Sequence, residues 1–109
     1  MKPHGYAGRV LRVDLTEGRI TEEPTMRYAE SYVGGRGINA RILFDELSPS
    51  VKPLDPENML LFGVGPLVGT LSPFCSRVSI DTKSPFTGGV GSANWTSWSH
   101  SQIKPLPPW

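Results

Sequence analysis

The alternation of apolar and polar positions divides the chain into short segments separated by glycine and proline. Residues 8–15 are rich in β-branched side chains and predict a strand, although their apolar and polar positions alternate poorly. Residues 16–18 predict a turn, in which Gly18 is free to adopt a positive φ, and residues 19–23 predict a short returning strand. An N-terminal hairpin is therefore expected.

Two short helices are expected after the hairpin. Thr25 is the predicted N-cap of the first, and Gly34 with Gly35 ends it. The second helix is expected from about Gly37 to Leu47. The apolar faces expected for the two helices are Met26, Ala29 and Val33 for the first, and Ile38, Ile42, Leu43 and Leu47 for the second.

The second half of the chain predicts a loop and then strands. Residues 51–58 contain two prolines and predict an extended loop, and residues 59–63 predict a buried strand. Residues 77–82 alternate between apolar and polar side chains, which predicts a half-buried strand. Residues 89–93 predict a further strand of small residues. The predicted fold class is therefore α+β, a β-sheet platform with an N-terminal hairpin and two short helices.

Composition agrees with this class and limits the function. In 109 residues there are 12 glycines and 11 prolines, which favours a loop-rich β or α+β fold over a helix bundle. The net charge of +1 gives no reason to expect nucleic acid or an anionic membrane as a partner. The longest apolar run, residues 59–62, is too short to cross a bilayer, and the first residues lack the apolar run of a signal peptide. A cytoplasmic location is expected.

Single motifs for cofactor binding are weak. Residues 35–40 match a dinucleotide fingerprint, but a predicted helix precedes these glycines where the fingerprint requires a strand. A joint between two helices is the favoured interpretation, and an anion near Arg36 at the helix N-terminus remains an alternative. Cys75 is the single cysteine, so this chain cannot ligate a four-iron cluster. His4 and His100 have no neighbour at metal-ligand spacing.

Arg77 is the most informative single residue, because it opens a predicted strand directly after a proline-containing turn. At the end of a sheet, an arginine is either a solvated surface charge or a guanidinium fork for phosphate or a polar ring edge. The residues alone leave both interpretations open.

Several motifs taken in order are far more specific than any one of them. They are Gly8-Arg9, Gly35-Arg36-Gly37, Pro56-Glu57-Asn58, Gly65-Pro66-Leu67, Arg77, Thr82-Lys83-Ser84-Pro85 and Ala93-Asn94. In this order, the chain from about Gly8 to Asn94 resembles the N-terminal domain of the tungsten-containing aldehyde:ferredoxin oxidoreductase family. The resemblance implies the front part of a domain that forms a platform for a tungsten (or molybdenum) bis-pterin cofactor near a four-iron cluster. The family oxidises aldehydes to carboxylic acids and passes electrons to ferredoxin.

Carried over by motif, the resemblance assigns expected roles to four residues. Arg77 would contact the pterin. Asn94 would lie at the phosphate end of the cofactor, with its backbone carbonyl binding a magnesium ion that bridges the pterin phosphates. The small residues up to Ala93 would allow the backbone to approach the pterin, and Thr96 stands at a position expected to contact phosphate. The resemblance assigns no catalytic residue.

The resemblance weakens after Asn94. Residues 95–109 hold all three tryptophans, and the family's usual Ser-Gly-Gly continuation is replaced. We therefore expect a partial pterin-binding domain over residues 1–94 and a divergent Trp/Pro-rich tail over 95–109. The expected function is that of an oxidoreductase fragment, inactive alone, whose partners are downstream domains or a homo-oligomer. The alternative is a non-enzymatic module or subunit that docks a partner through this tail.

Overall fold

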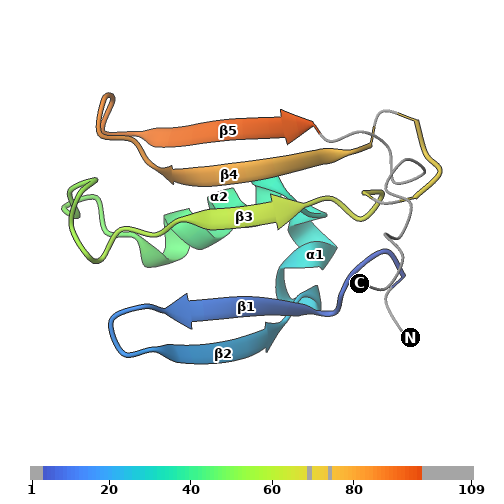
Figure 1. Cartoon of the computed structure of the whole chain (residues 1–109), viewed down its shortest axis with the longest axis horizontal. Helices are drawn as coiled ribbons and strands as arrows, with labels where there is room; N and C mark the ends of the chain where they lie inside the picture. Colours follow the sequence, from blue (N-terminus) through green and yellow to red (C-terminus); the bar gives the residue numbers. More distant parts are fainter. Residues whose placement is uncertain (1–3, 69, 74, 97–109) are drawn as a thin grey trace, which may run out of the picture.

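The computed structural model describes residues 4–68, 70–73 and 75–96. It has an α+β fold in which an N-terminal hairpin and a three-stranded antiparallel sheet are joined by two helices (Figure 1). The expected fold class is confirmed. The tail from 97 onward lies outside the described residues.

The hairpin consists of β1 (Arg9–Asp14) and β2 (Arg19–Pro24), with Val13 opposite Ile20. Asp14 Oδ1 accepts hydrogen bonds from the backbone N–H groups of Thr16 and Glu17, at 3.0 and 3.3 Å. This side chain thereby organises the turn, and Gly18 takes a positive φ of 67° as the sequence predicts.

Helix α1 (Met26–Tyr32) begins where expected, but its apolar face differs from the prediction in one residue. Ala29 is buried as predicted, whereas Val33 lies beyond the helix with a positive φ of 62° and is exposed. Tyr28 is buried instead. Thr25 occupies the N-cap position without a side-chain hydrogen bond, so it contributes no cap of the usual kind.

Helix α2 (Arg36–Glu46) follows α1 after three residues, and Ile38, Ile42 and Leu43 are buried as predicted. A Cβ at Gly37 would lie 2.6 Å from the carbonyl oxygen of Tyr32, so only glycine permits the two helices to approach this closely. Gly35 has a positive φ of 53°. The glycine-rich segment between α1 and α2 is therefore a helix–helix joint, which confirms the interpretation favoured from the sequence.

The three-stranded sheet has the order β3-β4-β5, with β3 (Leu61–Val64), β4 (Arg77–Lys83) and β5 (Val90–Thr96) all antiparallel. The prediction of a buried strand at 59–63 was wrong in burial, because the side chain of Phe62 is 67% exposed. The strand also begins two residues later than expected. β4 lies where the sequence places it, whereas β5 begins one residue later than expected and continues three residues further, to Thr96.

The apolar core is small and lies around the two helices. Its buried members are Tyr28, Ala29, Ile38 and Ile42, with Met26, Met59 and Leu61 packed against them. On β4 the buried residues are polar, since Ser79 and Asp81 face α2 and are 4% and 1% exposed. Alternation along β4 is thus present, but the polar side of the strand is the buried one.

Candidate functional site

The structure brings the four expected binding residues together on the β4–β5 pair. Arg77 pairs directly with Thr96, Ser79 with Asn94, and Ile80 with Ala93. Residues directly opposite in an antiparallel pair share a face, and successive residues alternate. Arg77 and Asn94 therefore occupy one face of the sheet, and Ala93 occupies the other.

Burial falls sharply along β4 toward this end of the sheet. Asp81 and Ser79 are buried beneath α2, whereas Arg77, two residues earlier on the same face, is exposed. Asn94 is exposed as well. The helix layer therefore stops short of the Arg77 end, and this guanidinium and the Asn94 amide are open to a ligand or to another polypeptide.

Arg77 also differs from most arginines of this chain in how it is used. The ion pairs among the described residues do not include it; they are formed by Arg9, Arg12, Arg19, Arg27 and Arg41. Arg12 is the most tightly held, because hydrogen bonds from its guanidinium to Glu46, and further to Glu23 and Tyr28, outweigh burial and raise its pKa above the ordinary value. Arg9, Arg12 and Arg27 join different elements of the fold, whereas Arg19 and Arg41 pair with acids in the hairpin turn and within α2.

A buried polar cluster supports β4 directly behind the exposed end. Asn39 Nδ2 donates a 2.8 Å hydrogen bond to Asp81 Oδ2, and Ser79 Oγ donates to the same oxygen at 2.8 Å. Asn39 reaches β4 across Gly63, where a Cβ would lie 2.7 Å from Asn39 Oδ1. Sequence reasoning missed this cluster, because an asparagine beside the apolar positions of a helix is ordinarily expected to be exposed.

Electrostatics around Asp81 favour its charged form. Burial opposes ionisation, but the nearby Ser92 hydroxyl and the hydrogen bonds from Asn39 and Ser79 outweigh it. The positive charge of Arg36 acts in the same direction. The pKa of Asp81 is consequently held below its ordinary value. Ser92 Oγ and Asp81 Oδ1 are both buried and make no hydrogen bond of normal geometry within the part of the chain that is described.

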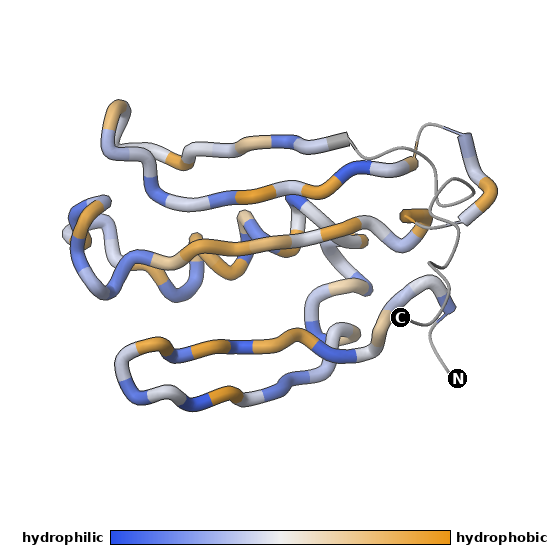
Figure 2. Tube along the Cα trace, in the orientation of Figure 1, coloured by the Kyte–Doolittle hydropathy of each residue, from blue (hydrophilic) through white to orange (hydrophobic). Residues whose placement is uncertain are grey.

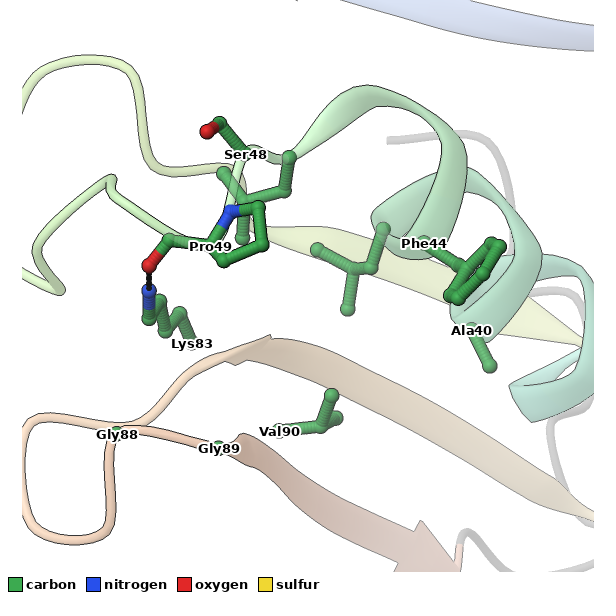
Figure 3. Close-up of a pocket in the computed structure, with 10 residues that line it drawn as sticks. Ala40, Phe44, Ser48, Pro49, Lys83, Gly88, Gly89 and Val90 are labelled. Atoms are coloured by element: carbon green, nitrogen blue, oxygen red, sulfur yellow. Dashed lines mark hydrogen bonds between the residues drawn. The ribbon is translucent and has the colours of Figure 1, made fainter.

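A shallow pocket lies at the other end of the β4–β5 pair, about 20 Å from Arg77 at the usual rise of a strand (Figure 3). It has a volume of about 270 Å³ and lies between the C-terminal half of α2 and the turn before β5. Lys83 borders it, and its ammonium donates hydrogen bonds to the carbonyl oxygens of Pro49 and Val51. Lys83 is thus occupied in holding the loop after α2, so the pocket presents mainly apolar groups such as Phe44 and Val90.

Metal-binding side chains do not converge anywhere in residues 4–68, 70–73 and 75–96. No group of three or more His, Cys, Asp or Glu residues in these ranges is placed to hold a metal ion. Cys75 is partly buried, and its thiol donates to the carbonyl oxygen of Ser72 at 2.9 Å. No helix within the same ranges is long and apolar enough to span a membrane.

Chemically, the Arg77 end offers recognition groups, and the residues described on its face of the sheet, Arg77 and Asn94, include no acid or base. The guanidinium presents several N–H donors in one plane, and the Asn94 amide offers both a donor and an acceptor. β5 is an edge strand of the described sheet, so part of its backbone N–H and C=O groups faces outward. Such an edge suits a flat, polar, anionic ligand that is bound by several hydrogen bonds.

Comparison with known proteins defines the class to which this fold and site belong. The family model for the aldehyde ferredoxin oxidoreductase N-terminal domain matches residues 10–106. The chain therefore belongs to the aldehyde ferredoxin oxidoreductase family and corresponds to its N-terminal domain.

Relatives with different activities share this segment. The tungsten-containing aldehyde ferredoxin oxidoreductase of Pyrococcus abyssi is 42% identical over 101 residues, which are 92% of this chain. The aliphatic sulfonate oxidoreductase WOR-like subunit of Pyrococcus furiosus is 38% identical over 91 residues. A chain of the active-site complex BamBC of benzoyl coenzyme A reductase, solved with 1,5-dienoyl-CoA, superimposes with a TM-score of 0.79 at 42% identity over 84% of this chain.

The matched segment is a small part of each relative. It spans 17% of the Pyrococcus abyssi protein and 14% of the solved reductase chain. Most of each relative consequently lies outside the region compared.

Proposed function

We propose that this chain supplies part of the platform that binds a bis-pterin cofactor of tungsten or molybdenum in an oxidoreductase. In the proposed whole enzyme, aldehydes are oxidised to carboxylic acids and the electrons pass to ferredoxin in the cytoplasm. The bound metal centre supplies the redox chemistry, and a four-iron cluster is ligated by residues outside this chain. Alone, the chain is inactive, because the described residues include no acid, base or metal-ligand set placed for catalysis.

The observation that carries this proposal is the exposed Arg77 at the start of β4, on the same face as Asn94. A bis-pterin cofactor combines flat polar rings with phosphates, and a guanidinium fork can bind either bidentately. Ala93 faces the other side of the sheet, so its contact to the cofactor would come from its backbone at the open edge of β5. The proposed contacts to the cofactor are therefore Arg77, Ala93, Asn94 and Thr96, with the Asn94 carbonyl as a magnesium ligand.

The range of relatives supports a role in binding a shared group. Their names refer to aldehyde, aliphatic sulfonate and benzoyl coenzyme A chemistry, yet each is 38–42% identical to this chain over the region compared. A segment common to proteins with different substrates is expected to serve something that they share. A cofactor platform meets that expectation better than a substrate pocket does.

A chimera tests the proposal. Residues 10–96 would replace the matching segment of the Pyrococcus abyssi relative, and Arg77→Ala and Arg77→Lys would be compared with Arg19→Ala. Arg19 is an exposed arginine on the hairpin, ion-paired with Glu17 at 2.7 Å, and is the matched control. Loss of a bidentate charged contact costs about 2–5 kcal/mol, so we expect Arg77→Ala to lower tungsten and pterin content at least tenfold.

Arg77→Lys should recover only part of this loss, because an ammonium cannot form the planar fork. Arg19→Ala should retain the full tungsten and pterin content. Unchanged cofactor content and turnover in both Arg77 variants would show that Arg77 is a solvated surface charge and that the proposed site is wrong.

The alternative of a non-enzymatic module rests on the Trp/Pro-rich tail, residues 97–109 of which lie outside the described part of the chain. Deletion of residues 97–109 from the 109-residue chain would abolish capture of a partner if the tail were the docking element. Retention of the partner without the tail would exclude that alternative.

A further inference from the structure

In both sheets, polar side chains are buried or half-buried on the face turned toward the helices, and large apolar side chains are exposed on the opposite face. In the hairpin, Arg12 points toward the helices, where its guanidinium contacts Tyr28 and Glu46. Leu11 and Val13, on either side of Arg12, must project from the opposite face. They are 58% and 57% exposed, and Ile20, directly opposite Val13, is 65% exposed.

The three-stranded sheet repeats this arrangement. Ser79 and Asp81 face α2, so Val78 and Ile80 face away from it. Their strand partners lie on the same face: Phe62 opposite Ile80, and Val64 and Trp95 opposite Val78. Phe62 and Trp95 are 67% and 71% exposed. The apolar face therefore runs across all three strands.

Both apolar faces are turned away from α2, because the opposite faces carry Arg12 and Asp81, which bind Glu46 and Asn39 of α2. Figure 1 views the three-stranded sheet with α2 behind β3 and β4, and the hairpin lies beside this sheet, with α1 between them. In the same orientation, Figure 2 shows hydrophobic positions along both β1 and β3. We call the side turned away from α2, consisting of Leu11, Val13, Ile20, Phe62, Val64 and Trp95, the bare face. Apolar groups spread over two adjoining sheets are typical of an interface, not of a surface that remains in water.

We infer that the bare face is an interface for the downstream part of the oxidoreductase polypeptide, the part that follows the matched segment in the relatives. This inference rests on the proposed function, because it assumes that the chain works within the larger enzyme. It identifies the partner as polypeptide of the same enzyme, whether that polypeptide is covalently continuous with this chain or separate from it.

Three observations favour this occupant over a second copy of the chain. The same fold occurs as 14% of a much longer chain in the solved reductase complex, so there it belongs to a polypeptide with ample further sequence. The matched segment is 17% of the Pyrococcus abyssi relative, which leaves ample sequence to form a covering layer. The family match also continues to residue 106, beyond the end of β5, so family sequence runs on from the strand that carries Trp95.

Hydroxyl-radical footprinting read by mass spectrometry tests the inference. The 109-residue chain would be compared with the chimera in which residues 10–96 replace the matching segment of the Pyrococcus abyssi relative. We expect Phe62 and Trp95 to be oxidised at least fivefold more slowly in the chimera. Tyr28 is 7% exposed and serves as the internal reference that reacts slowly in both proteins. Equal rates at Phe62 and Trp95 in the two proteins would overturn the inference.

Two further measurements keep the test decisive. If the chimera does not accumulate in soluble form, footprinting of the unaltered relative at the positions aligned with Phe62 and Trp95 gives the same answer. Sedimentation velocity of the 109-residue chain tests whether a second copy of the chain binds the bare face. A dimer that Phe62→Glu converts to a monomer, while Leu54→Glu on an exposed loop does not, would make a second copy the occupant and overturn the inference.

The inference and the proposed function can fail separately. A chimera that holds the cofactor but leaves Phe62 and Trp95 reactive would overturn the interface and keep the cofactor role. A chimera that protects both residues, but whose cofactor content does not respond to Arg77 substitution, would keep the interface and overturn the proposed site.

Discussion

Asn39 Nδ2 lies 2.8 Å from Asp81 Oδ2 and joins α2 to β4 through a hydrogen bond that is buried at both ends. Asn39 is 3% and Asp81 is 1% exposed. Ser79 Oγ donates to the same carboxylate oxygen. Because Arg77 is two residues before Ser79 on the same strand face, this bond holds in place the strand that presents Arg77.

We predict that Asn39→Ala destabilises the 109-residue chain. The substitution removes a donor to a buried carboxylate, and hydrogen bonds to charged groups contribute about 1.5–3 kcal/mol. The control is Asp45→Ala, which removes only an exposed ion pair with Arg41 one helical turn away, worth at most about 0.5 kcal/mol. Urea unfolding followed by circular dichroism measures both, and equal effects would contradict the prediction.

Gly63→Ala should disturb the same bond from the side of β3. Its Cβ would lie 2.7 and 2.9 Å from the amide atoms of Asn39, so Asn39 must move, and crowding of this kind costs about 1–3 kcal/mol. Gly65 is the matched control, since a Cβ there meets nothing within 4 Å. Gly65→Ala should leave the midpoint of unfolding nearly unchanged.

The double variant Asn39→Ala, Gly63→Ala refines this test. Once the Asn39 side chain is removed, the new methyl group no longer collides with it. The double variant should therefore lose less stability than the sum of the losses of the two single variants. Full additivity would indicate that Gly63→Ala acts through some contact other than Asn39.

The contrast between the predictable and the unpredictable parts of this chain has a physical basis. Strand and helix positions followed from local signals, such as the glycines of the helix–helix joint and the alternation along β4. Burial did not follow, because alternation shows that a strand has two different faces but not which one meets the helices. For Phe62 and Asp81, the apolar residue is exposed and the acid is buried. The sequence pattern alone leaves the choice of the buried face open.

The candidate site was predictable only in part, and for a related reason. The motif order indicated Arg77 and Asn94, and strand register then placed them on one face. The role of Asn39 could not be predicted, because its hydrogen bond to Asp81 joins residues that are 42 positions apart in the sequence. Val33 was assigned to a helix face by spacing alone, but the helix ends before it.

Acid should weaken the folded state through Asp81. Its pKa is lower in the folded chain than in the unfolded chain, so the unfolded chain binds more protons over the intervening range. The stabilisation is therefore fully present above the ordinary carboxyl pKa of about 3.9 and is lost as the pH falls toward the lower folded value. Denaturant titrations between neutral pH and about pH 2 should show this loss.

Asp81→Asn is the matched control for the acid transition. The amide does not titrate, so the variant should be less stable at neutral pH but should lose less stability on acidification. An acid-dependent loss of the same size in both proteins would assign the effect to other carboxylates.

Finally, we predict that the 109-residue chain neither reduces a dye in the presence of aldehyde nor holds a four-iron cluster. Cys75 is the only cysteine, and a cluster of this kind is usually bound by four thiolates. The Cys75 thiol is already engaged with the carbonyl oxygen of Ser72.

After incubation with iron and sulfide under reducing, oxygen-free conditions, the monomer isolated by gel filtration should carry far less than one cluster. Cys75→Ser should give the same low iron content, because one thiol makes no difference to a site that lacks the other ligands. Stoichiometric iron and sulfide in the monomer, lost in Cys75→Ser, would show that this chain ligates a cluster after all and that the division of labour proposed for the enzyme is wrong.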